Sequence, residues 1–434
     1  MRESRRPTAL TAASLVAAIV LAGVRGTEAG LGESLACSSP GTFLVQSGPP
    51  SLFPDPGFFM PGPVPAGPIA RSQRVESPRG DRRTPPSFRS ELVTPDVERA
   101  VTRGLRYLAN AQDADTGAFG EISKSTTEPR IAVTALAALA FLANGDTPGR
   151  GPFGRNAEMA LTYLVNMNRA NPRSLAKRPI GNYFVVVNDT ISRMHGHGYA
   201  TLAAAEALGM YGVSRQTGTA GTERLREAVE GAVALVENTQ SREGGWYYEP
   251  EPGSGHEGSI TITILQALRS ARTAGIEVNR QAIDRALDYV IKSQNPDGSF
   301  SYALRDRRTS AALTAAAVAT LHAFGLYDNH KVEQAIKNGM DYLERHQFEV
   351  DEQWFFYNAF YTAQALWFDP TTQRFDDWYR EMRADLLASQ DSVSGAWADV
   401  RPTANFPDYG RAYATAFACL ILQMPYGYLP ILQR

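Results

Sequence analysis

Two kinds of apolar segment alternate along the chain. One kind is amphipathic: in its first copy Val97, Val101, Leu105 and Leu108 recur at helical spacing, with polar residues between them. The other kind, as in Ile131–Ala143, is apolar on every face. A helix that is apolar all round is buried all round. The pattern therefore predicts outer helices with one exposed face and inner helices with none.

A turn signal closes each amphipathic segment and repeats along the chain. Its full form is a Gln, followed within a few residues by Gly, one further residue and an aromatic. The full copies are Gln112-Gly117-Phe119, Gln240-Gly244-Trp246, Gln294-Gly298-Phe300 and Gln390-Gly395-Trp397. Two copies are degenerate: Gln347 and Trp354 lack the Gly, and Asn168 has Tyr183 as a distant aromatic. Six similar units are predicted from about residue 95 onward.

Each part of the signal has a physical role. Gln at a helix end can bond the free carbonyls there or backbone groups of the next turn. Gly permits positive φ, and the aromatic can bury against the neighbouring unit. An amphipathic and a wholly apolar helix in every unit predict two concentric layers. An open superhelix usually has atypical polar ends, whereas here the first and last units carry the full signal, so a closed ring is favoured.

The repeated Gln, Gly and aromatic resemble the repeat of squalene and oxidosqualene cyclases and of protein prenyltransferase β subunits. The resemblance covers about three quarters of the chain. It implies an all-α fold, an α/α toroid in which about twelve helices form a double ring over residues 96–434. It implies little about activity, because one fold hosts many chemistries.

The reactive groups of the resembling families are missing from the sequence. No Asp-x-Asp-Asp acid opens an inner segment; Asp113-Ala114-Asp115-Thr116 lies in a turn and lacks the last Asp. Cys419, the only cysteine of the repeat region, is flanked by Ala and Leu with no His after it, unlike a prenyltransferase zinc ligand. The Gly-Cys-Gly-Glu-Gln thioester is absent as well. We therefore expect a binding protein. Whether it is an enzyme stays open.

In a ring of parallel inner helices the N-termini meet at one mouth, where dipole ends and free N–H groups favour ligand binding. Residues near those starts are the candidate site residues. They are Glu128, His195, His197, Tyr199, His256, Glu257, Asp306, Arg308, Tyr361, Asp408, Arg411 and Tyr413. The alternative role is capping or inter-helix bonding, which helix starts need in any protein. A functional mouth predicts that His197, Glu257 and Arg308 face one partly exposed space.

Three kinds of ligand fit such a mouth: a lipid or isoprenoid, a glycan, or a protein. An aromatic-lined apolar cavity would favour the lipid. A polar groove with two carboxylates about 6–10 Å apart would favour glycan cleavage, with a pair such as Glu128 and Glu257 as acid and base and with Tyr361 and Tyr413 as stacking platforms. The formal charge of −2 offers no electrostatic case for nucleic acid.

His195-Gly196-His197 is the sharpest local pattern among these residues. Two imidazoles one Gly apart could bind a metal, with His256 or Glu257 completing the set. Metal sites usually show more definite third and fourth ligands, so we predict neither a metal nor a cofactor. Glu206 is a lone carboxylate in an Ala-rich inner segment. If buried it must be paired or protonated, and an inter-helix hydrogen bond is expected.

The N-terminal region differs in composition from the repeats. Arg2, Arg5 and Arg6 precede an apolar run over 9–24, and small residues end the stretch at Ala29. This pattern is typical of a signal peptide over residues 1–29, and it is short for a membrane anchor, although an uncleaved anchor stays open. Residues 30–95 are dense in Pro and Gly and are predicted to be a disordered linker. We expect an exported protein, periplasmic or extracellular, whose mature form is not embedded in a membrane.

Overall fold

The structure is a computed structural model. It describes residues 91–119, 129–170, 180–186, 189, 191–213, 220–251, 253, 255–326, 328–348, 350, 354–398 and 409–433. These residues all fall in one compact unit, which is described here. The predicted signal peptide and most of the predicted linker lie outside the described residues, as do Glu128 and Asp408.

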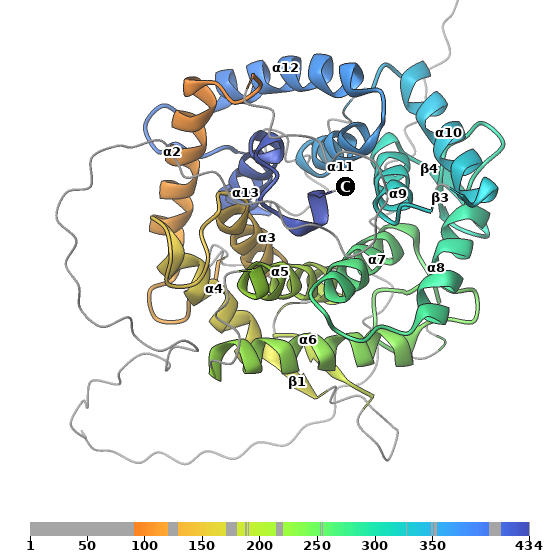
Figure 1. The fold of residues 1–434 in the computed structure, drawn as a ribbon, viewed down its shortest axis with the longest axis horizontal. Helices are drawn as coiled ribbons and strands as arrows, with labels where there is room; N and C mark the ends of the chain where they lie inside the picture. Colours follow the sequence, from red (N-terminus) through yellow and green to blue (C-terminus); the bar gives the residue numbers. More distant parts are fainter. Residues whose placement is uncertain are drawn as a thin grey trace, which may run out of the picture. The chain divides into compact units, whose positions relative to one another are not determined.

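Within the described ranges, twelve α-helices form two concentric rings (Figure 1). The outer ring consists of α2 (Pro95–Ala111), α4 (Gly154–Met167), α6 (Ala220–Thr239), α8 (Arg280–Lys292), α10 (His330–Arg345) and α12 (Thr372–Ser389). The inner ring consists of α3 (Arg130–Ala143), α5 (Arg193–Val213), α7 (Gly258–Thr273), α9 (Ala311–Ala323), α11 (Phe355–Phe368) and α13 (Gly410–Leu422). The predicted α/α toroid is confirmed.

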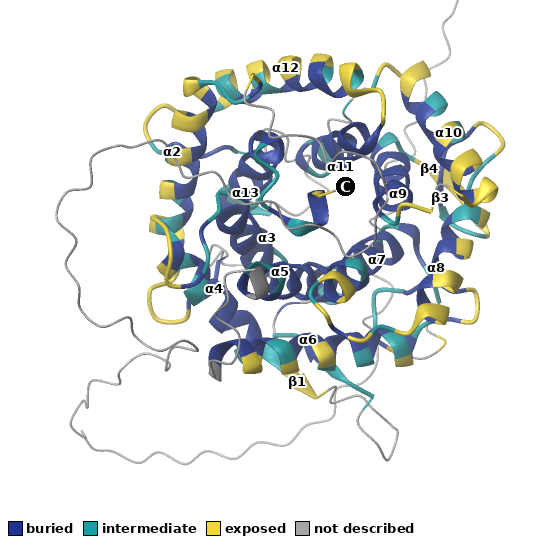
Figure 2. Cartoon of the chain, in the orientation of Figure 1, coloured by how far each residue is buried: buried dark blue, intermediate teal, exposed yellow. Residues whose placement is uncertain are grey.

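The burial of the helices in each ring is as the sequence predicts. The outer helices expose one face and bury the other, whereas the inner helices are buried almost throughout (Figure 2). Cys419 lies fully buried in α13, as expected of a small core residue. The first outer helix begins as the sequence suggests, because Thr94 accepts from the Val97 amide and Pro95 stands in the first turn. Leu92 upstream is fully buried, so packing begins slightly before residue 95.

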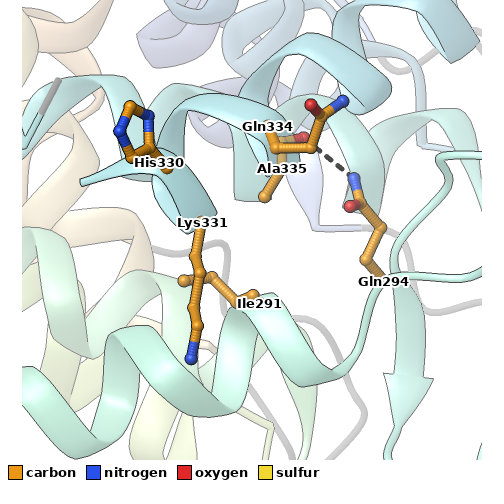
Figure 3. Close-up of a pocket in the computed structure, with 6 residues that line it drawn as sticks. All are labelled: Ile291, Gln294, His330, Lys331, Gln334 and Ala335. Carbon is orange, nitrogen blue, oxygen red and sulfur yellow. Dashed lines mark hydrogen bonds between the residues drawn. The ribbon is translucent and has the colours of Figure 1, made fainter. Parts of the chain in front are cut away.

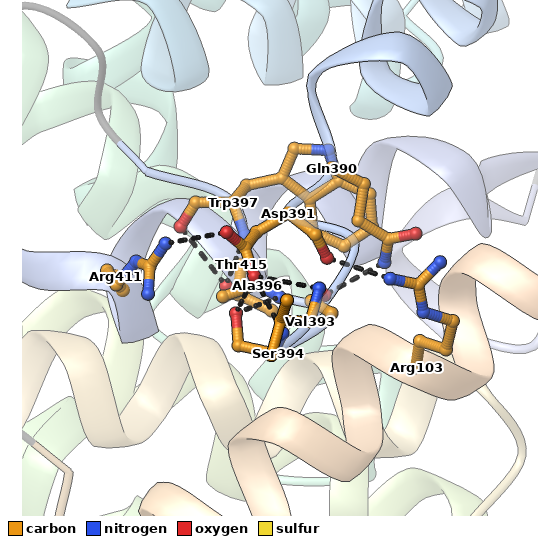
Figure 4. A network of polar contacts seen from close by, with 10 residues as sticks. Arg103, Gln390, Asp391, Val393, Ser394, Ala396, Trp397, Arg411 and Thr415 are labelled. Carbon is orange, nitrogen blue, oxygen red and sulfur yellow. Dashed lines mark hydrogen bonds and ion pairs between the residues drawn. The ribbon is translucent and has the colours of Figure 1, made fainter.

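The ring is closed. The last inner helix, α13, packs against α3 and α2 of the first unit, and α12 packs against α2. Gln390 of the last unit donates to the Ala100 carbonyl 2.9 Å away. Arg103 of α2 donates to the Asp391 carbonyl at 2.7 Å (Figure 4). Units one and six are therefore joined by the same kind of contact that joins consecutive units.

The repeat glutamine ties each turn to the next outer helix. Gln294 Nε2 donates to Gly298 O in its own turn at 3.1 Å and to Ala335 O in α10 at 2.8 Å. Gln112, Gln240 and Gln390 each make the equivalent pair of bonds. Gly298 has φ +94°, and a Cβ on it would lie 2.2 Å from Asn338 O. The turn therefore needs Gly both for its backbone angle and for this close approach.

The motif aromatics are buried between units, as predicted: Phe119, Trp246, Phe300 and Trp397 are at most 1 % exposed. Each backbone N–H donates to a threonine of the following inner helix, at 2.9–3.1 Å. The acceptors are Thr134, Thr261, Thr314 and Thr415. A threonine 14–18 residues after the aromatic was therefore part of the repeat signal, although the sequence analysis did not include it.

The two degenerate units depart from this scheme. In the second, Phe184 rather than the predicted Tyr183 occupies the motif place, because the Phe184 N–H donates to His197 Nδ1 at 3.3 Å. His197 thus replaces the threonine. In the fifth, Gln347 is exposed with φ +55° and makes no bond of the repeat type among the described residues. This copy, which the sequence already marks as degenerate because it lacks the Gly, therefore also lacks the glutamine contacts of the full copies.

Among the described residues, two short antiparallel strand pairs lie between the helices and contact inner helices. β1 (Asn168–Ala170) pairs with β2 (Asn182–Phe184), and β3 (Ser301–Ala303) pairs with β4 (Asp306–Thr309). After α13, the 3₁₀ turns η3 (Met424–Tyr426) and η4 (Pro430–Leu432) bring the chain back inside the ring (Figure 1). No helix of the described residues is both long enough and apolar enough to cross a bilayer.

Candidate functional site

The inner helices run parallel. This is shown by residues that stand equally far from the starts of their helices and meet across the ring. Tyr199 and Tyr361, each the seventh residue of its helix, bring their hydroxyls to 3.3 Å. Their helices, α5 and α11, lie on opposite sides of the inner ring (Figure 1). Both side chains are nearly or fully buried. This tyrosine pair therefore bridges the barrel, and burial raises the pKa of Tyr199 far above its usual range.

One helical turn nearer the N-termini, the lining becomes accessible. Tyr357 stacks edge-on against Tyr361 with ring centroids 4.7 Å apart, and Tyr413 packs against Phe417 at 4.9 Å. Tyr357 and Tyr413 are half-buried, whereas Tyr361 and Phe417 have no accessible surface. The buried hydroxyl of Tyr357 has no hydrogen bond of good geometry among the described residues. Tyr357 and Tyr413 therefore keep some accessible surface at the mouth, and the buried Tyr199–Tyr361 pair lies one helical turn deeper.

The wall opposite Tyr357 and Tyr413 is polar. His195 of α5 lies 3.0 Å through Nε2 from Ser259 Oγ of α7, and that hydroxyl donates to Glu257 Oε2 at 2.7 Å. Burial lowers the pKa of His195 to about 4, so the ring is neutral at pH 7. Because Ser259 gives its proton to Glu257, His195 donates Nε2–H to Ser259 and keeps Nδ1 as an acceptor. We call His195, Ser259, Tyr357, Tyr413 and the tyrosine pair the mouth cup.

The order His195, Ser259, Glu257 positions the imidazole and does not activate the serine as a nucleophile. In a hydrolytic triad the histidine stands between serine and carboxylate. Here the serine stands between them. Glu257 itself is fully buried as the cap of α7 and accepts from the Ser259 and Ile260 amides at 3.0 and 2.8 Å. Burial raises its pKa, and the hydrogen bonds it accepts oppose that rise by favouring the ionised form.

The β3–β4 hairpin and the segment after Trp246 carry a second aromatic pair. The hydroxyls of Tyr248 and Tyr302 are hydrogen-bonded, and the His195 ring meets Tyr248 edge-on at 6.1 Å. Arg308 stacks over Tyr302 at 5.5 Å and is paired with Asp306. Sequence reasoning missed Tyr248 and Tyr302, because both precede the inner helices by several residues and lie in segments with no helical period.

The structure separates several of the predicted site residues. His197 is fully buried in its motif role, Glu257 is fully buried as a cap, and Arg308 is exposed on the hairpin. These three do not share one partly exposed space, so that expectation was wrong. Its physical reason is that His197 points outward to Phe184, away from the barrel axis. Their contacts match the capping and inter-helix alternative.

The remaining candidates have individual partners. His256 Nδ1 is 3.0 Å from the Tyr289 hydroxyl. Arg411 lies 3.5 Å from Asp391, in the turn network of Figure 4. Glu206 is fully buried and bonded to Ser270 of α7, which confirms the expected inter-helix hydrogen bond. In the described part of the chain, no group of three His, Cys, Asp or Glu side chains is arranged to hold a metal ion.

The outer wall carries a groove of its own between α8 and α10 (Figure 3). It is lined by Ile291, Gln294, His330, Lys331, Gln334 and Ala335. The dashed bond in the groove runs from Gln294 to the Ala335 carbonyl, so this polar group already serves the repeat. The mouth, where accessible aromatics and a positioned imidazole converge, is the better candidate site.

Comparison with known proteins agrees with this architecture. The family model of the squalene-hopene cyclase C-terminal domain matches residues 207–367. Drimenyl diphosphate synthase from Streptomyces showdoensis is 28 % identical over 212 residues, which are 48 % of this chain and 33 % of that protein. The match thus spans about a third of this curated relative.

Solved structures share the fold at low identity. A type II terpene cyclase from Scytonema, bound to geranylgeranyl dihydroxybenzoate, has a TM-score of 0.51 at 15 % identity, covering 78 % of this chain and 100 % of its own. Cellobiose 2-epimerase from Bacillus thermoamylovorans scores 0.54 at 14 %, covering 75 % and 98 %. An α-1,6-mannanase from Salegentibacter scores 0.53 at 7 %, covering 76 % and 99 %.

Fold and repeat together define an α/α toroid. More particularly, the chain is a terpenoid cyclase-like α/α toroid, as the repeat and these matches jointly show.

Proposed function

We propose that the protein binds an apolar, isoprenoid-like ligand in the mouth cup and lacks the proton donor of a cyclase. The observation that most supports this proposal is a change in side-chain exposure along the axis of the inner ring. Tyr357 and Tyr413 keep accessible surface, and the Tyr199–Tyr361 pair closes the layer below them. Aromatic walls with a few fixed polar groups are the usual lining of a site for an apolar small molecule. The drimenyl diphosphate synthase match supports the isoprenoid class.

Among the described residues, Glu257 is the carboxyl that bonds to the mouth cup, and its contacts oppose a role as proton donor. A cyclase acid must give a proton to an alkene, so its carboxyl has to be protonated and aimed at the substrate. Glu257 instead accepts bonds from two amides and one hydroxyl, and none of its surface is accessible. These same bonds oppose the glycan alternative, which needs two available carboxylates facing the sugar. Its proposed partner, Glu128, lies outside the described residues.

Binding is tested by calorimetric titration with farnesol and, separately, with cellobiose. We expect saturable binding of farnesol that weakens on the order of tenfold or more in Tyr413→Ala, because an aromatic contact is lost from the cup. Tyr342→Ala, a half-buried tyrosine of the outer helix α10, is the matched control and should bind like the parent. Cellobiose binding without farnesol binding would overturn the ligand class.

The missing acid is tested separately. Farnesyl diphosphate incubated with the purified protein should be recovered as a linear compound by mass spectrometry. A cyclic product that disappears in Glu257→Gln would show that this carboxyl donates a proton after all.

Export belongs to the same proposal. The basic residues, apolar run and small residues over 1–29 support a secreted or periplasmic binding protein. Intact-mass analysis of the exported protein should show an N-terminus near residue 30. A chain beginning at Met1 in a membrane fraction would indicate an anchor instead.

A further inference from the structure

The far end of the inner barrel, where the inner helices finish, is occupied by the segment Leu429–Gln433. Leu429, Ile431 and Leu432 are buried there, and η4 packs against α5 and α7. Figure 1 shows this segment inside the inner ring. We call it the plug segment.

Side chains from three inner helices hold the plug segment, and every one of them bonds its backbone. Glu206 of α5 accepts from Ile431 N at 2.9 Å. Arg269 of α7 donates to Ile431 O at 2.5 Å and to Gln433 O at 3.1 Å. Trp367 of α11 donates to Leu432 O at 2.9 Å. Three separate helices thus converge on one backbone N–H and three backbone carbonyls of the plug segment.

The side chains that bond the plug segment are themselves held in place by other contacts. Glu206 is fully buried, and its other oxygen is held by Ser270. A buried carboxylate needs donors, and one of its donors is a plug amide. Arg269 lies 5.8 Å over the Phe368 ring, so its guanidinium is held in place before it reaches the plug carbonyls.

Besides these bonds, the plug segment is held by the burial of Leu429, Ile431 and Leu432 and by a bond from Gln433 Nε2 to Gly427 O at 3.3 Å. Its internal bonds are those of one 3₁₀ turn, Leu432 N to Leu429 O and Gln433 N to Pro430 O. Gly427 upstream has φ +66°, and residues 427 and 428 are half-buried. The plug segment belongs to none of the twelve described helices, so its release would break none of their internal hydrogen bonds.

From this geometry we propose that the far end is a peptide-binding site that recognises backbone atoms, and that the plug segment is its exchangeable resident. The ligand class is a short extended or 3₁₀ peptide with apolar side chains. Because the polar contacts read only N–H and C=O groups, side chains need only be apolar and small enough to fit. When the plug leaves, the barrel gains a second opening opposite the mouth cup.

The direct test uses the chain shortened after Tyr428 and a fluorescein-labelled peptide of residues 427–434. Anisotropy should show saturable binding to the shortened chain and little binding to the full chain, whose tethered plug acts at an effective concentration of about millimolar. Arg269→Met in the shortened chain should weaken binding at least about tenfold, since two charge-assisted bonds are lost. Arg272→Met, an exposed neighbour on the same helix, is the matched control and should bind normally.

A folded shortened chain with no saturable binding would overturn the proposal, and so would binding that Arg269→Met leaves unchanged. Hydrogen exchange on the full chain covers the case in which the shortened chain does not fold. The Ile431 amide should exchange much faster than amides in the middle of α7, through an opening that leaves the ring intact. Equal protection at both places would mean that the plug is a fixed part of the core, and the proposal would fail.

Discussion

The two ends of the inner ring are built from the same six helices, yet their side chains differ in accessibility and in hydrogen bonding. At the mouth, Tyr357 and Tyr413 stay half-buried, and the Tyr357 hydroxyl has no well-placed partner among the described residues. At the far end, Glu206 is fully buried and bonded from two sides. One end retains accessible aromatic surface, and at the other the chain itself bonds both oxygens of the buried Glu206 carboxyl.

This contrast separates binding from stability. Buried groups with partners are expensive to disturb, because a lost partner leaves a desolvated polar atom behind. Half-buried aromatic side chains at the mouth are expected to contribute little to the stability of the free protein and more to the binding of a ligand. Substitutions at the far end should therefore change unfolding, and substitutions at the mouth should change binding.

The two ends of the inner ring exist only if the ring is closed. The largest loss of stability is therefore expected where units one and six meet. Trp397 is fully buried and donates Nε1–H to Leu386 O at 2.8 Å. Trp397→Ala should lower the free energy of unfolding by about 3–5 kcal/mol. Chemical denaturation followed by circular dichroism measures this. A loss below about 1 kcal/mol would show that units one and six do not depend on each other.

The far end comes next. Glu206→Ala removes the acceptor of Ile431 N–H and of the Ser270 hydroxyl, so the free energy of unfolding should fall by about 1–3 kcal/mol. Glu227→Ala, an exposed glutamate on α6, should stay within about 0.5 kcal/mol of the parent. If the two variants melt alike, the far end does not have the structural role assigned to it.

The same carboxylate predicts a pH dependence. Burial raises the pKa of Glu206 to about 7 from its usual 4.5, opposed by bonds from Ser270 and Ile431 N and by the charge of Arg269 on α7. A raised pKa means that the folded state holds the proton more tightly, so this contribution is complete below about pH 4.5 and is lost as pH rises to about 7. Glu206→Gln should flatten the thermal-melting profile across that window. A parent profile that rises there instead would contradict the assigned pKa shift.

The smallest effect on stability is expected at the mouth. Tyr357→Phe removes a hydroxyl with no well-placed partner among the described residues, so unfolding should change by less than about 0.5 kcal/mol. Tyr379→Phe is the control, because that buried hydroxyl donates to Leu422 O at 2.8 Å and its loss should cost about 1 kcal/mol. Equal losses in both would mean that the mouth hydroxyl is bonded within the protein.

The sequence predicted the ring because its signal is repeated and local. Gln294, Gly298 and Phe300 each have a backbone reason to stand where they do, and one reason repeated across units outweighs any single propensity. The site was harder to predict, because helix starts attract polar residues for capping as well as for function. Glu257 and His197 proved to be a cap and a motif acceptor. Tyr248 and Tyr302 reach the mouth only through the tertiary fold, so no local pattern marked them.

The central claim is that the isoprenoid-like ligand binds in the mouth cup, and photolabelling tests it most directly. The protein is irradiated with a diazirine analogue of farnesol, with and without excess farnesol, and labelled peptides are located by mass spectrometry. The account predicts labelling, suppressed by farnesol, in peptides that contain Tyr357 and Tyr413, at the starts of α11 and α13. Competed labelling confined to residues 429–433 or to the groove between α8 and α10 would contradict it.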